Sequence, residues 1–180
     1  MRTAQDVNRF WFEEHGRDDW FGGKAEFDAV LAAQFAETHR QVARGEAWQW
    51  RETPDGRLAE LIVLDQFSRQ LHRGSPEAFA QDKMALVLAQ EMVAAGLDLE
   101  IPMDRRMFVF MPYMHAESLV IQEEGCRHFA QFGPDMLKFM VGHRDCIARF
   151  GRFPFRNKAL GRESTPDEVA YMVAQGDSMF

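Results

Sequence analysis

The spacing of apolar residues constrains this sequence most, because it repeats with a helical period between glycine and proline residues. From Lys24 to Arg44 the apolar residues fall near one stripe, and Gly45 ends the pattern. Such spacing is typical of amphipathic helices, whereas strands show alternation of polar and apolar residues. No strand-like run is present in the sequence. Short connections containing glycine or proline favour neighbouring helices that pair in hairpins.

The sequence therefore predicts an all-α fold of about seven to nine helices, arranged as antiparallel αα-hairpins. At 180 residues the chain is expected to form a single helical domain spanning 1–180. A turn is expected at residues 53–56. The expected helical segments cover residues 3–14, 24–44, 57–72, 75–96, 102–112 (ended by Pro112), 114–132, 134–150 and a last helix from 165.

Composition excludes several classes of protein. The longest apolar stretches, 61–64 and 107–111, are too short to span a bilayer, and the N-terminus lacks the apolar core of a signal peptide. Two cysteines without a Cys-x-x-Cys motif suggest neither a disulfide framework nor a zinc ribbon. A formal net charge of −7 argues against general nucleic-acid binding. We expect a cytoplasmic protein with neither a membrane nor a nucleic-acid partner.

A basic segment near the C-terminus stands out against this acidic background. It carries five cations and no acid between Asp145 and Glu163, and the cations are Arg149, Arg152, Arg156, Lys158 and Arg162. Guanidinium groups bind carboxylate or phosphate well, so Arg152, Arg156 and Asn157 are candidate donors to a small anionic ligand, with Arg162 beside them. Alternatively, the same arginines pair with acids such as Asp65, Glu117 or Asp145 and hold a buried loop in place.

Polar residues also interrupt the apolar segment 57–72. Asp65 and Arg69 are four residues apart, as a helical ion pair requires, and Gln66 lies beside them. A buried carboxylate without a partner is costly, so these residues form either a structural pair or a pocket wall.

Two histidines and a carboxylate are the candidate catalytic groups. On the expected helix 114–132, His115 and Gln122 share one face whereas Glu117 points away, and His143 lies on another helix. Imidazole titrates near working pH and suits acid–base catalysis. The spacing lacks the His-x-x-x-His pattern of a metal site, so we expect neither metal nor cofactor.

Four motifs in order resemble the bacterial family of domain of unknown function 924. They are Leu64-Asp65-Gln66-Phe67-Ser68-Arg69, Met111-Pro112-Tyr113-Met114-His115-Ala116-Glu117, Phe150-Gly151-Arg152-Phe153-Pro154-Phe155-Arg156-Asn157 and Gly161-Arg162-Glu163-Ser164-Thr165-Pro166. The resemblance implies a helical fold similar to tetratricopeptide-repeat superhelices, and it implies no function. Where the family commonly has proline, serine and histidine, this chain has Ser68, Ala116 and Phe155. The polar residues that match the motifs are expected to converge in one cluster.

Two hypotheses about function follow. In the first, the arginines bind a small carboxylate or phosphate, with Gln66 and Asn157 orienting it; whether the protein is also an enzyme is left open. In the alternative, a helical superhelix binds a peptide or another subunit without catalysis, by analogy of fold alone. A groove already filled by residues 172–180 would argue against this alternative.

Overall fold

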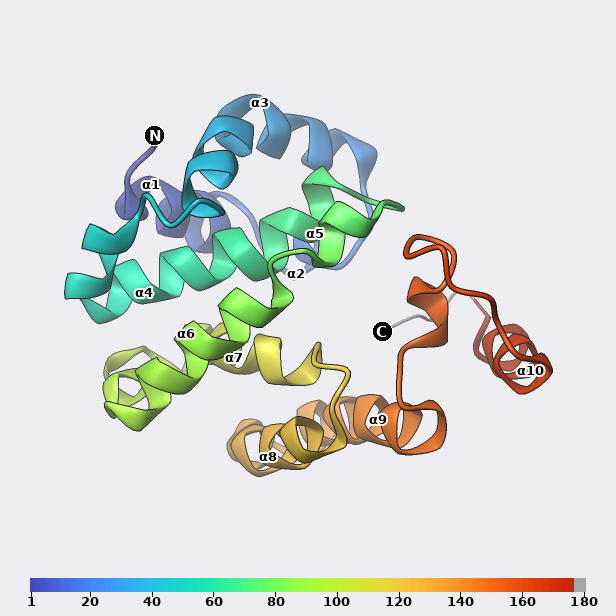
Figure 1. Ribbon diagram of the computed structural model, residues 1–180. Coiled ribbons are helices and arrows are strands. Elements are labelled where there is room, and N and C mark those ends of the chain that lie inside the picture. Colours follow the sequence, from blue (N-terminus) through green and yellow to red (C-terminus); the bar gives the residue numbers. More distant parts are fainter. Residues whose placement is uncertain (177–180) are drawn as a thin grey trace. The chain divides into compact units, whose positions relative to one another are not determined.

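The computed structural model describes residues 1–176, which form helices and connections without strands (Figure 1). The expected all-α fold is therefore confirmed over this part of the chain. The chain divides into two compact units, the first made of residues 1–73 and 77–112 and the second of residues 74–76 and those from 113 onward. The single domain over 1–180 and the tetratricopeptide-like stack both stay predictions.

The first unit holds the N-terminal helices. Their bounds are α1 (Ala4–Arg9), η1 (Phe10–Glu14), α2 (Arg17–Trp20), α3 (Ala25–Val42), η2 (Trp48–Glu52), α4 (Pro54–Leu61), η3 (Ile62–Phe67), α5 (Ser68–Leu71), η4 (Pro76–Phe79, whose first residue belongs to the second unit), α6 (Asp82–Ala94), η5 (Leu97–Glu100) and all but the end of α7 (Met103–Met114). The elements η1 and η3 are π-helical turns, and η2, η4 and η5 are 3-10 helices.

The expected turn at residues 53–56 is wrong, because these residues start a helix. The hydroxyl Oγ1 of Thr53 accepts a hydrogen bond from the backbone N–H of Gly56 at 3.1 Å, and Pro54 is the first residue of α4. A threonine cap followed by proline is as favourable at a helix start as in a turn. The helix therefore begins at Pro54 instead of Arg57.

Aromatic rings make up the core of the first unit. Phe10, Trp11, Phe35, Phe67 and Phe108 are all at most 1% exposed. Ring centroids are 4.9 Å apart for Phe10 and Phe35, and 5.7 Å apart for Trp11 and Phe108. Each such ring contributes roughly 1.5–3 kcal/mol by leaving water, so this cluster joins η1, α3, η3 and α7.

The second unit contains α8 (Leu119–Phe129), η6 (Ala130–Phe132), α9 (Pro134–Phe150), η7 (Pro154–Arg156) and α10 (Pro166–Gln175). Helices α8 and α9 lie side by side (Figure 1). Gly125 of α8 faces Met140 of α9 so closely that an added Cβ would lie 2.6 Å from the methionine Cε. Gly151 ends α9 with a φ of 69°, a conformation that favours glycine.

The expected helix over 114–132 is wrong at its start. Helix α7 runs through Pro112 to Met114, residues 115–118 form a connection, and α8 begins at Leu119. The buried Gln122 explains this end, since its amide Nε2 donates to the carbonyls of Met114 at 2.7 Å and Ala116 at 2.8 Å. His115 and Glu117 therefore lie in a connection, and the expected helical face shared by His115 and Gln122 does not exist.

Replacing Gln122 with leucine is expected to lower the free energy of unfolding by about 1–3 kcal/mol, because buried carbonyls lose their donor. Urea unfolding of the variant measures this loss. Gln131 provides the control, since its exposed amide also donates to a backbone carbonyl, that of His128. The matching leucine variant is expected to change stability by less than about 0.5 kcal/mol. Equal losses in the two variants would contradict the capping role of Gln122.

In the part of the chain from 1 to 176, no helix has both the length and the apolar character needed to cross a bilayer. Residues 177–180 of the segment 172–180, named above as a possible filling of a groove, lie outside the described residues.

Candidate functional site

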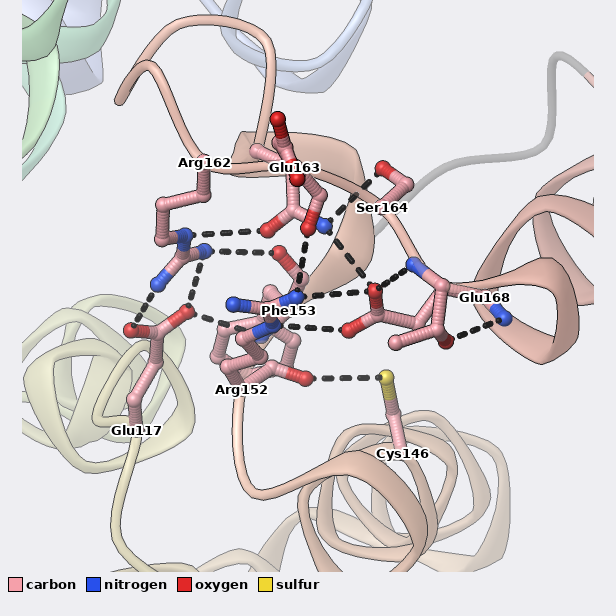
Figure 2. A network of polar contacts seen from close by, with 10 residues as sticks. Glu117, Cys146, Arg152, Phe153, Arg162, Glu163, Ser164 and Glu168 are labelled. Carbon is pink, nitrogen blue, oxygen red and sulfur yellow. Dashed lines mark hydrogen bonds and ion pairs between the residues drawn. The ribbon is translucent and has the colours of Figure 1, made fainter.

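The carboxylate of Glu117 anchors the basic segment of the second unit. Glu117 lies in the connection before α8, and both of its carboxylate oxygens accept hydrogen bonds from Arg162, at 2.8 and 2.9 Å. The backbone N–H of Phe153 donates to Oε1 at 2.7 Å. Figure 2 shows the side chains of Glu117 and Arg162 facing each other. This bidentate pair is one of the structural pairings that the sequence left open.

Electrostatics keep this carboxylate ionised. Burial favours the protonated form of Glu117, but hydrogen bonds from Arg162 and from the backbone N–H of Phe153 outweigh it and lower the pKa of the carboxyl group. A carboxylate with a lowered pKa is a poor general acid or base near neutral pH. The contacts of Glu117 support a positioning function, and its catalytic function stays a prediction.

A second pair joins the loop to the start of α10. Arg152 donates from Nε to Glu168 Oε1 at 2.7 Å and from Nη2 to Glu168 Oε2 at 2.9 Å (Figure 2). Glu168 also accepts from the backbone N–H of Thr165, whose hydroxyl accepts in return from the N–H of Glu168, so the two residues form a capping box at the expected helix start. Hydrogen bonds from Arg152 lower the pKa of Glu168 to about 2.

Asn157 connects these two pairs. Its side chain is fully enclosed, with 1% of the residue exposed. The amide oxygen accepts from Arg162 Nε at 2.9 Å, and Nδ2 donates to Ser164 Oγ at 3.0 Å and to Glu168 Oε2 at 3.3 Å. Because each atom of the amide is engaged, the loop from Gly151 to Thr165 is held as one polar network.

The other candidates of the second unit lie around the same loop. Arg156 donates from Nη2 to the carbonyl of His115 at 2.9 Å and stacks on Phe153 at 4.6 Å. His143 is buried, and its Nδ1 lies 3.0 Å from the carbonyl of Phe139. Since a carbonyl only accepts, Nδ1 carries the proton. The ring of His143 also packs against Phe153, so a structural contact is found where the sequence suggested a catalytic one.

Asp65, Gln66 and Arg69 form a buried cluster in the first unit. Asp65 is 1% exposed and accepts from Gln66 Nε2 at 2.6 Å. Arg69 Nη1 lies 3.3 Å from Asp65 Oδ1 and donates to the carbonyl of Asp65 at 2.6 Å. Both terminal nitrogens of Arg69 also reach Asp82, at 3.0 and 3.1 Å. Burial opposes the charge of Arg69, but the two aspartates outweigh it and raise its pKa.

The predicted cluster of all candidates is thus seen as two groups, one in each unit. Asp65, Gln66 and Arg69 belong to the first, and the loop residues with Glu117 and the two histidines belong to the second. Convergence of the two groups stays a prediction. Over residues 1–176, no group of three or more histidine, cysteine, aspartate or glutamate residues is arranged to hold a metal ion.

Sequence reasoning missed a buried serine–histidine contact in the first unit. Ser68, at the position where the family commonly has proline, donates from Oγ to the carbonyl of Leu64 at 2.6 Å. His39 Nε2 lies 2.8 Å from the same Oγ, so this nitrogen is the donor. His39 and Ser68 are 29 residues apart, and no local sequence pattern indicates the contact. Ser68 is fully buried, so its hydroxyl is not open to a ligand.

Arg149 was counted among the cations of the basic segment but was not chosen from the sequence as a donor to a ligand. It lies exposed in the last turn of α9, and its guanidinium stacks on Phe150 at 4.7 Å and on Tyr171 at 5.8 Å. Within residues 1–176 this guanidinium makes neither a hydrogen bond nor an ion pair. A depression of about 450 Å³ lies beside it, lined by Arg149, Phe150, Arg152, Thr165, Asp167 and Glu168. The sequence signal that was available for Arg149 is its position two residues before Gly151, which ends α9.

Replacing Glu117 with alanine is expected to lower the free energy of unfolding by about 1–3 kcal/mol, because the backbone N–H of Phe153 loses its acceptor. Arg162 is partly exposed and can bind water instead, which limits the loss. Chemical denaturation measures the change. The matched control is Glu124→Ala, whose carboxylate pairs with an exposed arginine, and this variant should stay within about 0.5 kcal/mol of the wild type. A neutral effect of Glu117→Ala would contradict the anchoring role.

Comparisons with known proteins agree with this architecture. The sequence model of a family described as bacterial protein of unknown function (DUF924) matches residues 7–176. The solved structure of a protein of unknown function from Agrobacterium tumefaciens is similar, with a TM-score of 0.90 and 37% sequence identity. The match covers 96% of this chain and 97% of that chain. No curated protein matches the chain.

Proposed function

Because the chain belongs to the DUF924 family of bacterial proteins of unknown function, its activity cannot be taken from a relative, and we propose from the geometry of the second unit that it binds a small anionic ligand. The ligand bears a carboxylate or a phosphate. Its site is the depression beside α9 and α10, where the guanidinium of Arg149 and the Nη1 group of Arg152 are the donors.

The observation that carries this proposal is the difference between Arg149 and the other arginines of the loop. Arg162 directs all three guanidinium nitrogens to Glu117, Phe153 and Asn157. Arg149 contacts two aromatic rings, which leave the in-plane N–H groups of the guanidinium accessible. Because a guanidinium presents five donors in a planar fork, it suits a carboxylate or phosphate that approaches in this plane.

Arg152 adds a second donor to the same depression. Its Nε and Nη2 bind Glu168, and Nη2 also binds the carbonyl of Glu163 at 2.8 Å. Its Nη1 has no hydrogen-bond partner in the described part of the chain, and Arg152 lines the depression. The pair with Glu168 fixes the orientation of this guanidinium before a ligand arrives, which reduces the entropy cost of binding.

The remaining candidates act as supports in this proposal. Asn157 and Arg162 hold the loop that carries Arg152, and Arg156 holds the loop against the carbonyl of His115. Their contribution to ligand affinity is therefore indirect. A catalytic step by His115 or His143 is not part of the proposal, since the contacts described for them are structural.

The test is thermal unfolding in the presence of acetate, citrate and phosphate, with chloride at equal ionic strength as the reference. A ligand at ten times its dissociation constant stabilises by about 1.4 kcal/mol, which shifts the midpoint by roughly 3–6 °C for a chain of this size. The shift is expected in the wild type and in Lys158→Gln, and is expected to be lost in Arg149→Gln. No shift with any anion, or an equal shift in Arg149→Gln, would overturn the proposal.

The alternative, a non-enzymatic module that binds a peptide or another subunit, stays a prediction. Its support is that Val169 and Val173, four residues apart on α10, are 47% and 76% exposed. Residues with this spacing lie on one helix face.

A further inference from the structure

The depression beside Arg149 carries charges of both signs. Of its lining residues, Arg152 and Glu168 form a bidentate ion pair and largely neutralise each other. Asp167 is exposed, and its carboxylate forms neither a hydrogen bond nor an ion pair among residues 1–176. Arg149 is exposed as well, and its guanidinium forms neither kind of contact in the described part of the chain. The depression therefore presents one uncompensated cation and one uncompensated anion, both along its lining.

Arg149 also lines a second depression, in which an acid is again present but is paired with another cation. A second depression of about 320 Å³ is lined by Gly142, Asp145, Cys146, Arg149, Tyr171 and Gln175. Asp145 is exposed and pairs with Arg144 at 2.7 Å. Burial raises the pKa of both Cys146 and Tyr171, so these groups stay neutral and add no anion near Arg149. Acids thus flank Arg149 in both depressions.

A ligand with only negative charge is poorly matched to this surface. Its carboxylate or phosphate gains from Arg149, but Asp167 lines the same depression and repels further negative charge. Like charges repel one another even where water screens them. A ligand that places a cation near Asp167 turns this repulsion into attraction.

We propose that the ligand of this site is amphoteric, with a carboxylate that binds Arg149 and an ammonium group that binds Asp167. A free amino acid or a short ω-amino acid has this chemistry. The inference rests on the proposed function, because it assumes that Arg149 holds the anionic group, and it adds the class of ligand. Phe150 supplies an apolar wall for the carbon chain between the two charges.

The experiment compares ligands that differ only in the ammonium group, by calorimetry or thermal shift. The probes are alanine, β-alanine and γ-aminobutyrate, each against its matched acid (propionate or butyrate) and its N-acetyl derivative. In the wild type, at least one amino acid is expected to bind about ten-fold more tightly than its matched acid, since one charge-assisted contact contributes about 1.4 kcal/mol or more. Acetylation is expected to remove this advantage.

Variants separate the two proposals. Asp167→Asn should bring the amino acid to the affinity of the acid, whereas the matched control Glu163→Gln should keep the ten-fold advantage. Arg149→Gln should abolish binding of both. The amphoteric ligand is refuted, while anion binding stands, if acid, amino acid and N-acetyl derivative bind equally to the wild type. The same holds if Asp167→Asn leaves the affinity for the amino acid unchanged. Equal binding of the N-acetyl derivative then points to a peptide C-terminus. If none of these probes binds, the amphoteric ligand is refuted; anion binding is overturned as well only if phosphate and citrate also fail to shift the unfolding midpoint.

Discussion

Replacing Arg69 with methionine is expected to lower the free energy of unfolding by about 3–5 kcal/mol, because it leaves buried carboxylates without their cation. Asp65 is 1% exposed and the Asp82 side chain 15% exposed, so water cannot fully replace the guanidinium. The carbonyl of Asp65 also loses its donor. Denaturation in urea measures the change, and the loss is expected without a change in the slope of the unfolding free energy against denaturant.

The first unit offers a matched control for this prediction. Arg73 forms a bidentate pair with Asp28, but 45% of its side chain is exposed. Arg73→Met is therefore expected to cost less than about 1 kcal/mol. The double variant Arg69→Met with Asp82→Asn should recover part of the loss, because one uncompensated charge is removed. A loss no larger for Arg69→Met than for Arg73→Met would show that this buried pair is not a stabilising contact.

The helix ends of this chain could largely be predicted from the sequence, because they depend on residues close together. The helix starts expected at residues 3 and 165 are both present, with capping boxes of Thr3 with Asp6 and of Thr165 with Glu168. A hydroxyl three residues before a carboxylate satisfies two backbone donors through local geometry alone. The same local signal at Thr53 was assigned to a turn, although it caps α4, because turns and helix starts share these residues.

The pairing of charges could be predicted only in part. The sequence indicated that loop arginines would find acids, and Arg162 does bind Glu117, 45 residues away. The partner of Arg152 was not foreseen, because Glu168 already had a local role in the capping box and serves both. The choice among several acids depends on how the loop returns to α10, and this is decided by burial and packing instead of by spacing. For the same reason the uncompensated Arg149 could not be recognised from its charge alone.

The stability of the protein is expected to depend on pH between 6.5 and 4 through His39. Burial, with a smaller effect from the charge of His72, lowers the pKa of His39 from 6.5 to about 4. In this window the unfolded chain binds the proton and the folded chain does not, so acidification favours unfolding. The contribution of neutral His39 is complete above pH 6.5 and is lost as the pH falls to 4. A shift of this size corresponds to about 3 kcal/mol.

Unfolding in urea at several pH values tests this, because the slope of stability against pH counts the protons taken up. His39→Gln is expected to flatten the slope between pH 6.5 and 4.5, whereas the control His72→Gln should keep most of it. Glu168 acts in a different window, since its pKa of about 2 means that its contribution is present above pH 4.5 and lost below. Ser68 gives the buried ring a hydrogen-bond partner, because its Oγ donates to the carbonyl of Leu64 and accepts from Nε2 of His39. An unchanged slope in His39→Gln would mean that the proton is taken up elsewhere and that burial of this ring does not set the acid limit of the fold.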